Sequence, residues 1–243
     1  MPDRPLCLLL PGFDGTGRLF APLLAEDRLP FEPRVVALPF DAPRGYDEFA
    51  TWLADQLPTD RQFALLAESF SGPLAIRIAS RRPKLLTHLV LVATFLCSPL
   101  RPSLSVLARL AHLGLFTRPP PAFAVRTLLT GWDAAPSIVA AVRDAMAVLP
   151  PEVSEARARA ALSADEAGAF AGLTIPTLWI RASADRLLRP GCADDASSSR
   201  PGIRLLAIDG PHMLLQVRPG ECLSAIERFL AVQTSMRERH GAI

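Results

Sequence analysis

A serine at position 69 ends a short apolar run, residues 63–67, and is followed by a segment with helical character. A serine held in a sharp turn between a strand and a helix presents its hydroxyl outward, and the bent backbone leaves room only for small neighbours. Ala67 and Ser71 meet that need, and Gly72 follows, although the usual pattern G-x-S-x-G has glycine at both flanking positions. We interpret Ser69 as a nucleophile; an ordinary helix-capping serine is the alternative that this stretch leaves open.

A serine hydroxyl attacks a carbonyl only when a base takes its proton, so Ser69 predicts a histidine and an orienting carboxylate farther along the chain. Of the four histidines, His88 stands at the far end of a predicted strand, His112 in a helical segment and His240 in the tail. His212 directly follows the last predicted strand. The carboxyl ends of parallel strands share one edge of the sheet, so His212 is predicted to lie on the same edge as Ser69.

The orienting carboxylate is expected one strand earlier, and Asp185 lies just past the end of that strand. Asp209 is the competing acid, but it stands three residues before His212 and is too near in sequence to reach the far imidazole nitrogen. Taken singly, each residue has an ordinary structural explanation. The order Ser69, Asp185, His212 at three predicted strand ends favours a catalytic triad.

Two backbone N–H groups are expected to stabilise the oxyanion of an acyl-transfer reaction. One belongs to Phe70, next to the nucleophile, and the other to Phe13, in the loop after the first predicted strand, where Gly12 and Gly15 permit the bend. Residues 14–17 could suggest a phosphate-binding loop, but they lack the P-loop lysine and the G-x-G-x-x-G spacing. A nucleotide site is therefore not predicted.

The elements that position these residues alternate between strand and helix. The predicted strands are 6–10, 34–38, 63–67, 89–93, 177–181 and 203–208, and the predicted helices outside the middle of the chain are 18–25, 46–57, 72–82, 192–199 and 220–232. Parallel strands need crossover helices, so the alternation predicts an α/β fold with a doubly wound, mostly parallel sheet. The polar tail after Gln233 is expected to fray.

The pattern changes between residues 98 and 165, where no strand-like run occurs. Helices are predicted at 104–116, 123–129, 137–148 and 154–162. Residues 1–97 and 166–243 are therefore expected to form the α/β core, and residues 98–165 an inserted helical lid.

The first of those helices, 104–116, is apolar nearly all round. That composition indicates a helix that covers an apolar substrate pocket. The candidate lining residues of this pocket are Phe13, Phe70, Leu107 and Leu110. A helix buried between the core and the lid is the alternative, and docking on a membrane surface is a third.

Two short motifs carry a family resemblance: PGFDGTG at residues 11–17 and ESFSG at residues 68–72. With the order Ser, acid, His and the inserted helices, the chain resembles the α/β-hydrolase fold superfamily of serine esterases, lipases and thioesterases over roughly its whole length, beginning at that fold's third strand. The two motifs are also similar to the hydrolase-like part of plastid phytyl ester synthases. The family's usual His-Gly in the oxyanion loop is Pro11-Gly12 here, which keeps the backbone donor.

Composition limits the remaining possibilities. With 243 residues, half of them hydrophobic, and a net charge of +2 without basic runs, the chain predicts one domain with an insertion and no nucleic-acid partner. The cysteines, at positions 7, 97, 192 and 222, lack metal-site spacing, so no metal is predicted and a reduced, cytoplasmic location is expected. No apolar run has the length of a membrane span.

The residues together predict hydrolysis of a carboxylic ester with an apolar acyl or alcohol part, through an acyl-enzyme on Ser69 and without a cofactor. The expected partner is a small apolar ester or thioester. A thioesterase, a C–C bond hydrolase and an acyltransferase would use the same residues, and a non-catalytic ligand-binding protein on this fold is the alternative from another class.

Overall fold

Six parallel strands form a single sheet in the order β2-β1-β3-β4-β5-β6. The computed structural model describes residues 4–99 and 118–240, with residues 232–240 described by their backbone alone. The strands are β1 (Leu6–Leu10), β2 (Glu32–Val35), β3 (Phe63–Glu68), β4 (Leu86–Val92), β5 (Thr177–Ala182) and β6 (Arg204–Ile208).

The central strands are apolar without alternation because both of their faces are covered. Every residue of β1, β3 and β4 is buried. The edge strands β2 and β6 are more exposed, and β2 contains Pro33, which an edge strand tolerates because it needs fewer ladder hydrogen bonds. Burial from both sides therefore explains why these strands appear in the sequence as continuous apolar runs.

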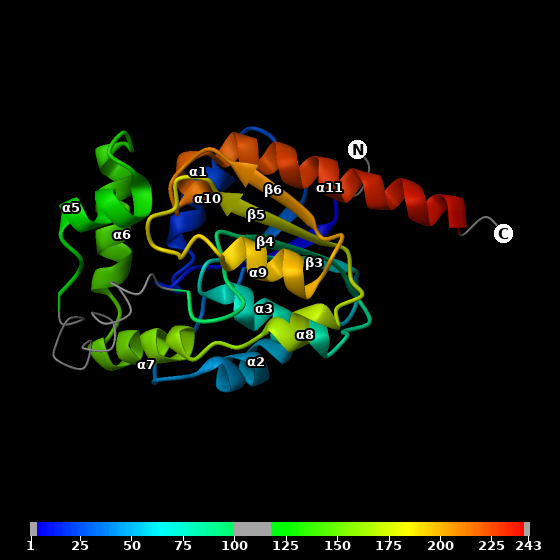
Figure 1. The fold of residues 1–243 in the computed structure, drawn as a ribbon, viewed down its shortest axis with the longest axis horizontal. Coiled ribbons are helices and arrows are strands. Elements are labelled where there is room, and N and C mark those ends of the chain that lie inside the picture. Colours follow the sequence, from blue (N-terminus) through cyan, green and yellow to red (C-terminus); the bar gives the residue numbers. More distant parts are fainter. Residues whose placement is uncertain (1–3, 100–117, 241–243) are drawn as a thin grey trace.

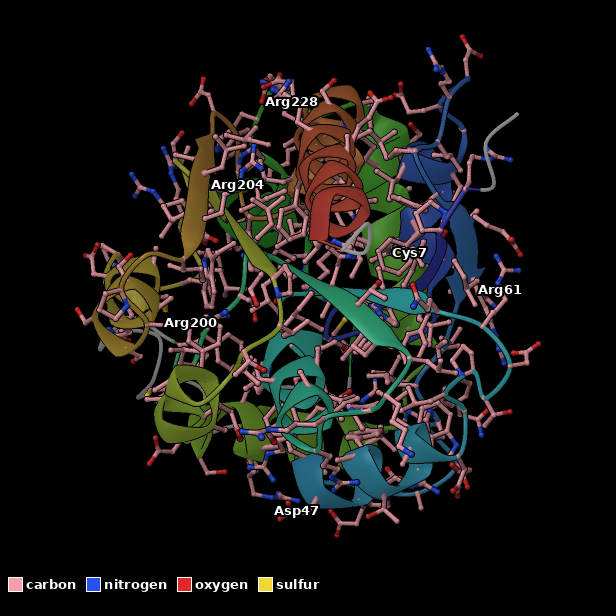
Figure 2. All side chains as sticks on the ribbon, turned by 90° about the vertical axis from the view of Figure 1, so that its right-hand side faces the viewer. Cys7, Asp47, Arg61, Arg200, Arg204 and Arg228 are labelled. Atoms are coloured by element: carbon pink, nitrogen blue, oxygen red, sulfur yellow. The ribbon has the colours of Figure 1, made fainter. Side chains whose placement is uncertain are left out.

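Helices cover both faces of the sheet (Figures 1 and 2). One face carries α1 (Ala21–Leu24), α10 (Leu214–Val217) and the long α11 (Pro219–His240), while the other carries α2 (Tyr46–Ala54), α3 (Ser71–Ser80), α8 (Ala167–Ala171) and α9 (Cys192–Ser199). Successive strand residues contribute to opposite cores: Leu8 packs with the α2 and α3 side, and Leu9 with the α11 side. The prediction of a doubly wound parallel sheet is confirmed.

Several element boundaries differ from the prediction. β2 begins at Glu32 and ends at Val35, and the segment 18–25 divides into a short 3₁₀ helix, η1 (Arg18–Phe20), and α1. The short helices α8 and α10 were not predicted. The last helix, α11, continues to His240, beyond its predicted end at residue 232.

The described residues between β4 and β5 are mainly helical. They contain α5 (Ala122–Val125), a π-helical turn η3 (Arg126–Thr130), α6 (Pro136–Ala147) and α7 (Pro151–Leu162), and the predicted helix 104–116 lies outside the described residues. α5, α6 and α7 lie beyond the ends to which the arrows of β5 and β6 point (Figure 1). An isolated antiparallel bridge pairs Cys97 with Asp165, so the chain returns to the sheet beside the point at which it left.

A small apolar cluster attaches α5 and α6 to the core. Its buried members are Leu19, Val125, Val139, Val142, Ala145 and Met213. Leu19 belongs to η1, and Met213 directly follows His212. The helices α5 and α6 therefore pack on the loop that carries the predicted base.

Charged side chains such as Asp47, Arg61 and Arg228 lie at the periphery, whereas Cys7 on β1 is buried (Figure 2). All four cysteines are free, and burial raises the pKa of Cys192 and of Cys222 to about 12. Of the helices within residues 4–99 and 118–240, none is both long and apolar enough to cross a membrane.

Candidate active site

Ser69 and Phe70 lie between the end of β3 and the start of α3, and Ser69 has a φ of 49°. A residue with a Cβ is strained in this left-handed region by about 1–2 kcal/mol. The neighbouring backbone holds it there: the Ser69 N–H donates to the Val92 carbonyl at 2.9 Å. Its own carbonyl accepts the Thr94 hydroxyl at 2.6 Å and the Gly72 N–H at 3.0 Å. The strained turn is therefore fixed by three hydrogen bonds.

The small residues around Ser69 explain how the turn forms without the two usual glycines. The Ser71 hydroxyl is buried and donates to the Pro11 carbonyl at 2.5 Å, which joins the elbow to the loop after β1. The close approach that glycine permits occurs one residue later. A Cβ on Gly72 would lie 2.7 Å from the Cβ of Thr94. Position 72 is therefore the one next to the elbow at which the absence of a side chain is needed.

Replacing Thr94 by valine should lower the free energy of unfolding by about 0.5–1.5 kcal/mol, because the buried Ser69 carbonyl loses its hydroxyl donor but keeps the Gly72 N–H, and the side-chain shape is kept. Urea denaturation measures the change. Thr51→Val is the matched control, since the Thr51 hydroxyl also donates to a carbonyl, that of Asp47, but on an exposed helix face. Equal stability losses in the two variants would contradict the role given to Thr94.

Three side chains from distant parts of the sequence form one hydrogen-bonded chain. His212 Nε2 lies 2.9 Å from Ser69 Oγ, and His212 Nδ1 lies 2.7 Å from Asp185 Oδ2. The other carboxylate oxygen, Asp185 Oδ1, accepts the N–H groups of Leu187 and Leu188, each at 2.9 Å. The imidazole is thus held on one side by a fixed carboxylate and faces the serine hydroxyl on the other.

The environment favours the ion pair that a proton transfer from Ser69 would create. Burial alone lowers the pKa of His212, but the Asp185 carboxylate and the nearby Glu68 together raise the pKa above its ordinary value. Burial alone raises the pKa of Asp185, but the interaction with His212 and the two N–H donors bring the pKa below its ordinary value. Asp185 therefore stays ionised beside His212 at neutral pH.

The other candidates lie elsewhere. Asp209 is exposed, and its carboxylate accepts the Ser183 hydroxyl at 2.7 Å. His88 lies within β4, where its Nδ1 is 2.9 Å from the Thr87 hydroxyl. His112 lies outside the described residues, and the side chain of His240 is not described.

The loop after β1 passes directly over the elbow. A Cβ on Gly12 would lie 3.8 Å from the Cβ of Ser69. The Gly12 carbonyl accepts the Gly15 N–H at 3.0 Å, so it points into a tight turn. In a trans peptide the N–H points away from the preceding carbonyl, which directs the Phe13 N–H out of that turn. Phe70 is the residue between Ser69 and the first turn of α3.

The two aromatic rings predicted to line the pocket differ in exposure. The Phe70 ring is 1% exposed, stacks on Tyr46 with 4.9 Å between centroids, and meets the ring of Phe49 edge-on at 6.0 Å. The Phe13 ring meets Phe70 edge-on at 5.9 Å and is only partly buried. The other two candidates, Leu107 and Leu110, lie outside the described residues.

Solved structures share this arrangement of strands and helices across nearly the whole chain. An enol-lactonase from Burkholderia xenovorans LB400 is 20% identical, with 94% of this chain and 92% of that one covered, at a TM-score of 0.78. A lipase-esterase related protein from Clostridium acetobutylicum is 13% identical, with 94% and 95% covered, at 0.80. A carboxylesterase from Bacillus subtilis is 18% identical, with 95% and 85% covered, at 0.73. The chain has the α/β-hydrolase fold. No protein-family model and no curated protein matches the sequence.

Sequence reasoning did not single out Glu68, a buried residue that immediately precedes the predicted nucleophile. Burial raises the pKa of Glu68 to about 7, and the hydrogen bond from Gln216 opposes the shift only in part. Gln216 Nε2 donates to Glu68 Oε2 and to the Leu19 carbonyl, both at 3.2 Å. The sequence signal that could have identified Glu68 is its place as an acidic residue at the end of an otherwise apolar strand. Glu68 therefore changes charge near neutral pH beside His212.

Replacing Glu68 by glutamine should make the free energy of unfolding less sensitive to rising pH. Folded Glu68 has a pKa of about 7 against an ordinary 4.5, so the folded state holds an extra proton between these values and loses stability as pH rises through them. The shift corresponds to about 3 kcal/mol. Urea denaturation at pH 5 and pH 8 measures the free energy of unfolding of both proteins. Relative to the wild type, the free energy of unfolding of Glu68→Gln should be higher at pH 8 than at pH 5 by a few kcal/mol. The exposed Glu227 provides the control Glu227→Gln, and an equal gain there would contradict the prediction.

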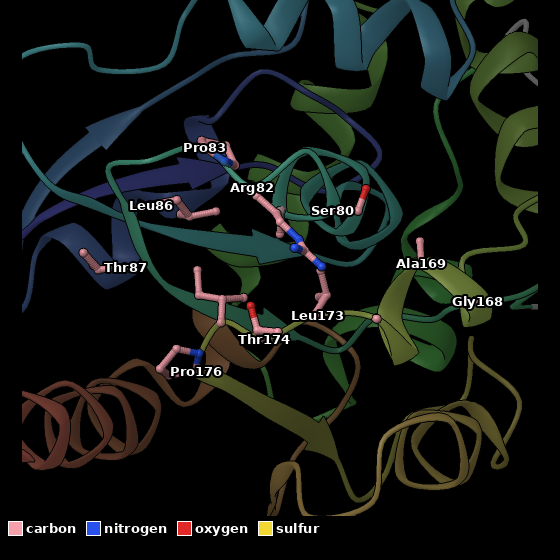
Figure 3. Close-up of a pocket in the computed structure, with 13 residues that line it drawn as sticks. Ser80, Arg82, Pro83, Leu86, Thr87, Gly168, Ala169, Leu173, Thr174 and Pro176 are labelled. Carbon is pink, nitrogen blue, oxygen red and sulfur yellow. The ribbon is translucent and has the colours of Figure 1, made fainter.

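A cavity of about 500 Å³ lies at the other end of the sheet (Figure 3). It is bounded by the end of α3, the start of β4, α8 and the segment before β5, with Arg82, Leu86 and Thr174 among its lining residues. These are the amino ends of the strands, so this cavity does not adjoin Ser69. Within the described parts of the chain, no three His, Cys, Asp or Glu side chains gather as metal ligands.

Proposed function

We propose that this chain is a serine hydrolase that cleaves a carboxylic ester with an apolar acyl or alcohol part. The observation that carries the proposal is the hydrogen-bonded chain from Ser69 through His212 to Asp185, with the serine on a strained turn at the carboxyl edge of the sheet. Nucleophile, base and orienting acid in contact are the arrangement that covalent acyl transfer needs.

The proposed reaction has two half-reactions. In the first, Ser69 Oγ attacks the ester carbonyl, His212 Nε2 takes the hydroxyl proton, and the Phe13 and Phe70 N–H groups stabilise the oxyanion. The tetrahedral intermediate collapses, His212 protonates the leaving alcohol, and the acyl group stays on Ser69. In the second, His212 takes a proton from water, the resulting hydroxide attacks the acyl carbon, and the acid leaves as Ser69 recovers its proton. Asp185 orients the imidazole throughout.

Two further features support this function. The similar structures include proteins named as an enol-lactonase and a carboxylesterase, and both names describe cleavage of an acyl–oxygen bond. Ser69 is 9% exposed and His212 5% exposed, so the reacting atoms are shielded from bulk water, as an apolar substrate requires. We propose that residues 98–165 form the lid that admits the substrate to a core made of residues 1–97 and 166–243. A cytoplasmic location suits four free thiols.

A panel of p-nitrophenyl esters of increasing acyl length, with matched thioesters, tests the proposal. The wild type should hydrolyse the oxygen esters with an initial burst and should prefer longer apolar acyl chains to acetate. Faster turnover of thioesters would reassign the chain as a thioesterase, and ester formation with an added alcohol would indicate an acyltransferase. Binding of acyl compounds without turnover of any substrate would favour a non-catalytic ligand-binding protein.

A further inference from the structure

Arg157 is a fully buried arginine that reaches from α7, in the inserted segment, to the loop after β1. Its Nη1 donates to the Phe13 carbonyl at 2.7 Å, and its Nη2 donates to the Pro39 carbonyl at 3.2 Å. The guanidinium also lies 5.7 Å from the centre of the Phe49 ring. Arg157 thus binds the backbone of Phe13, the residue that supplies the proposed oxyanion donor.

The loop is shaped to receive this guanidinium. A Cβ on Gly15 would lie 2.7 Å from Arg157 Nη2 and 2.8 Å from its Cζ, so the arginine occupies the space that a side chain would take. Gly15 also has a φ of +69°, which favours glycine. The buried Asp14 accepts the Thr16 N–H at 2.8 Å and lies near enough to offset part of the cost of burying the cation.

Two hydrogen bonds fix the peptide groups on either side of Phe13. The Gly12 carbonyl is bound by the Gly15 N–H, and the Phe13 carbonyl is bound by Arg157. With the carbonyl on each side of Phe13 fixed, the torsions of Phe13 have little freedom, and its N–H is held in one direction. A loop without Arg157 would lose the hydrogen bond that fixes the Phe13 carbonyl.

We propose that Arg157 is a positioning residue that holds the Phe13 N–H toward the oxyanion, so that the inserted segment completes the oxyanion hole of the core. The inference rests on the proposed function. It predicts that Arg157 acts on the transition state and not on the binding of the apolar substrate. A displacement of about 1 Å in a catalytic donor costs on the order of 100-fold in rate.

The test compares Arg157→Met and Arg157→Lys with the wild type, using kinetics normalised to the Ser69 sites that a fluorophosphonate titrates to completion. Arg157→Met should lower kcat about 10-fold to 100-fold with KM nearly unchanged. Arg157→Lys keeps the cation near Asp14 but lacks the two-pronged fork, so its loss should be smaller, about 3-fold to 10-fold. Arg159→Gln, two residues along the same helix and exposed, should stay within about twofold of the wild type.

Paired inhibitors separate a positioning role from a purely structural one. An alkyl trifluoromethyl ketone forms a tetrahedral adduct that needs the oxyanion hole, whereas the methyl ketone of equal length measures apolar binding alone. The trifluoromethyl ketone should lose affinity in each Arg157 variant by the factor by which kcat falls, and the methyl ketone should not. Unchanged trifluoromethyl ketone affinity would overturn the inference, and Arg157→Lys decides alone if Arg157→Met does not fold. A wild type without turnover or inhibition would instead overturn the proposed function.

Discussion

Replacing Ser69 by alanine should reduce ester turnover by about 10⁴-fold to 10⁶-fold, because within residues 4–99 and 118–231 only the Ser69 hydroxyl is hydrogen-bonded to His212 Nε2. The drop is expected in kcat, while apolar binding persists. Alanine retains a Cβ, so the strained φ of 49° and the hydrogen bonds of the elbow backbone are kept. Initial rates with a p-nitrophenyl ester measure the loss.

A fluorophosphonate probe supplies the independent check for Ser69, because it reacts only with an activated serine. The wild type should be labelled at Ser69 and Ser69→Ala should stay unlabelled. Ser80→Ala removes an exposed hydroxyl that donates to the Arg77 carbonyl, and this control should label and turn over like the wild type. Labelling that persists in Ser69→Ala would assign the nucleophile to another residue.

Asp185→Asn should lower kcat by about 10⁴-fold, because an asparagine cannot hold the imidazole in the tautomer that accepts the serine proton. The substituted amide side chain would keep the shape of the carboxylate and could still accept the Leu187 and Leu188 N–H groups. The loss should therefore appear in kcat more than in stability. The carboxylate that raises the pKa of His212 would also be gone, so the acidic limb of the rate profile should move to lower pH.

The second acid of this region provides the matched control. Asp209→Asn makes the same substitution three residues from His212, at an exposed position bonded to Ser183. Its turnover should stay within about twofold of the wild type. If Asp209→Asn lost activity and Asp185→Asn kept it, the roles given to the two carboxylates would have to be exchanged.

The sheet was predictable because its central strands are buried on both faces and appear as unbroken apolar runs. Once the strands were placed, their carboxyl ends predicted which of the titratable residues could meet, and the structure brings Ser69, Asp185 and His212 into contact. Their catalytic roles remain predictions for the variants to test. The short helices α8 and α10 escaped prediction because four or five residues carry too little periodicity.

Local sequence could not identify Arg157. It lies in the run Glu155-Ala156-Arg157-Ala158-Arg159, where its neighbour Arg159 has the same immediate surroundings yet remains exposed. Only the packing of α7 over the loop after β1 distinguishes the two arginines. The same holds for Glu68, whose raised pKa follows from burial that the strand pattern did not reveal.

The contact between Arg157 and the Phe13 carbonyl has a consequence for how the protein folds. Its two partners are 144 residues apart in the chain, and the contact with Pro39 spans 118 residues. The entropy cost of closing a loop grows with its length, so we expect contacts of this separation to form after the local helices and turns. We therefore expect a partly folded chain to form the elbow, whose Ser69–Val92 hydrogen bond spans far fewer residues, before the oxyanion loop is fixed. The capacity to stabilise charge would be among the last properties that the chain acquires.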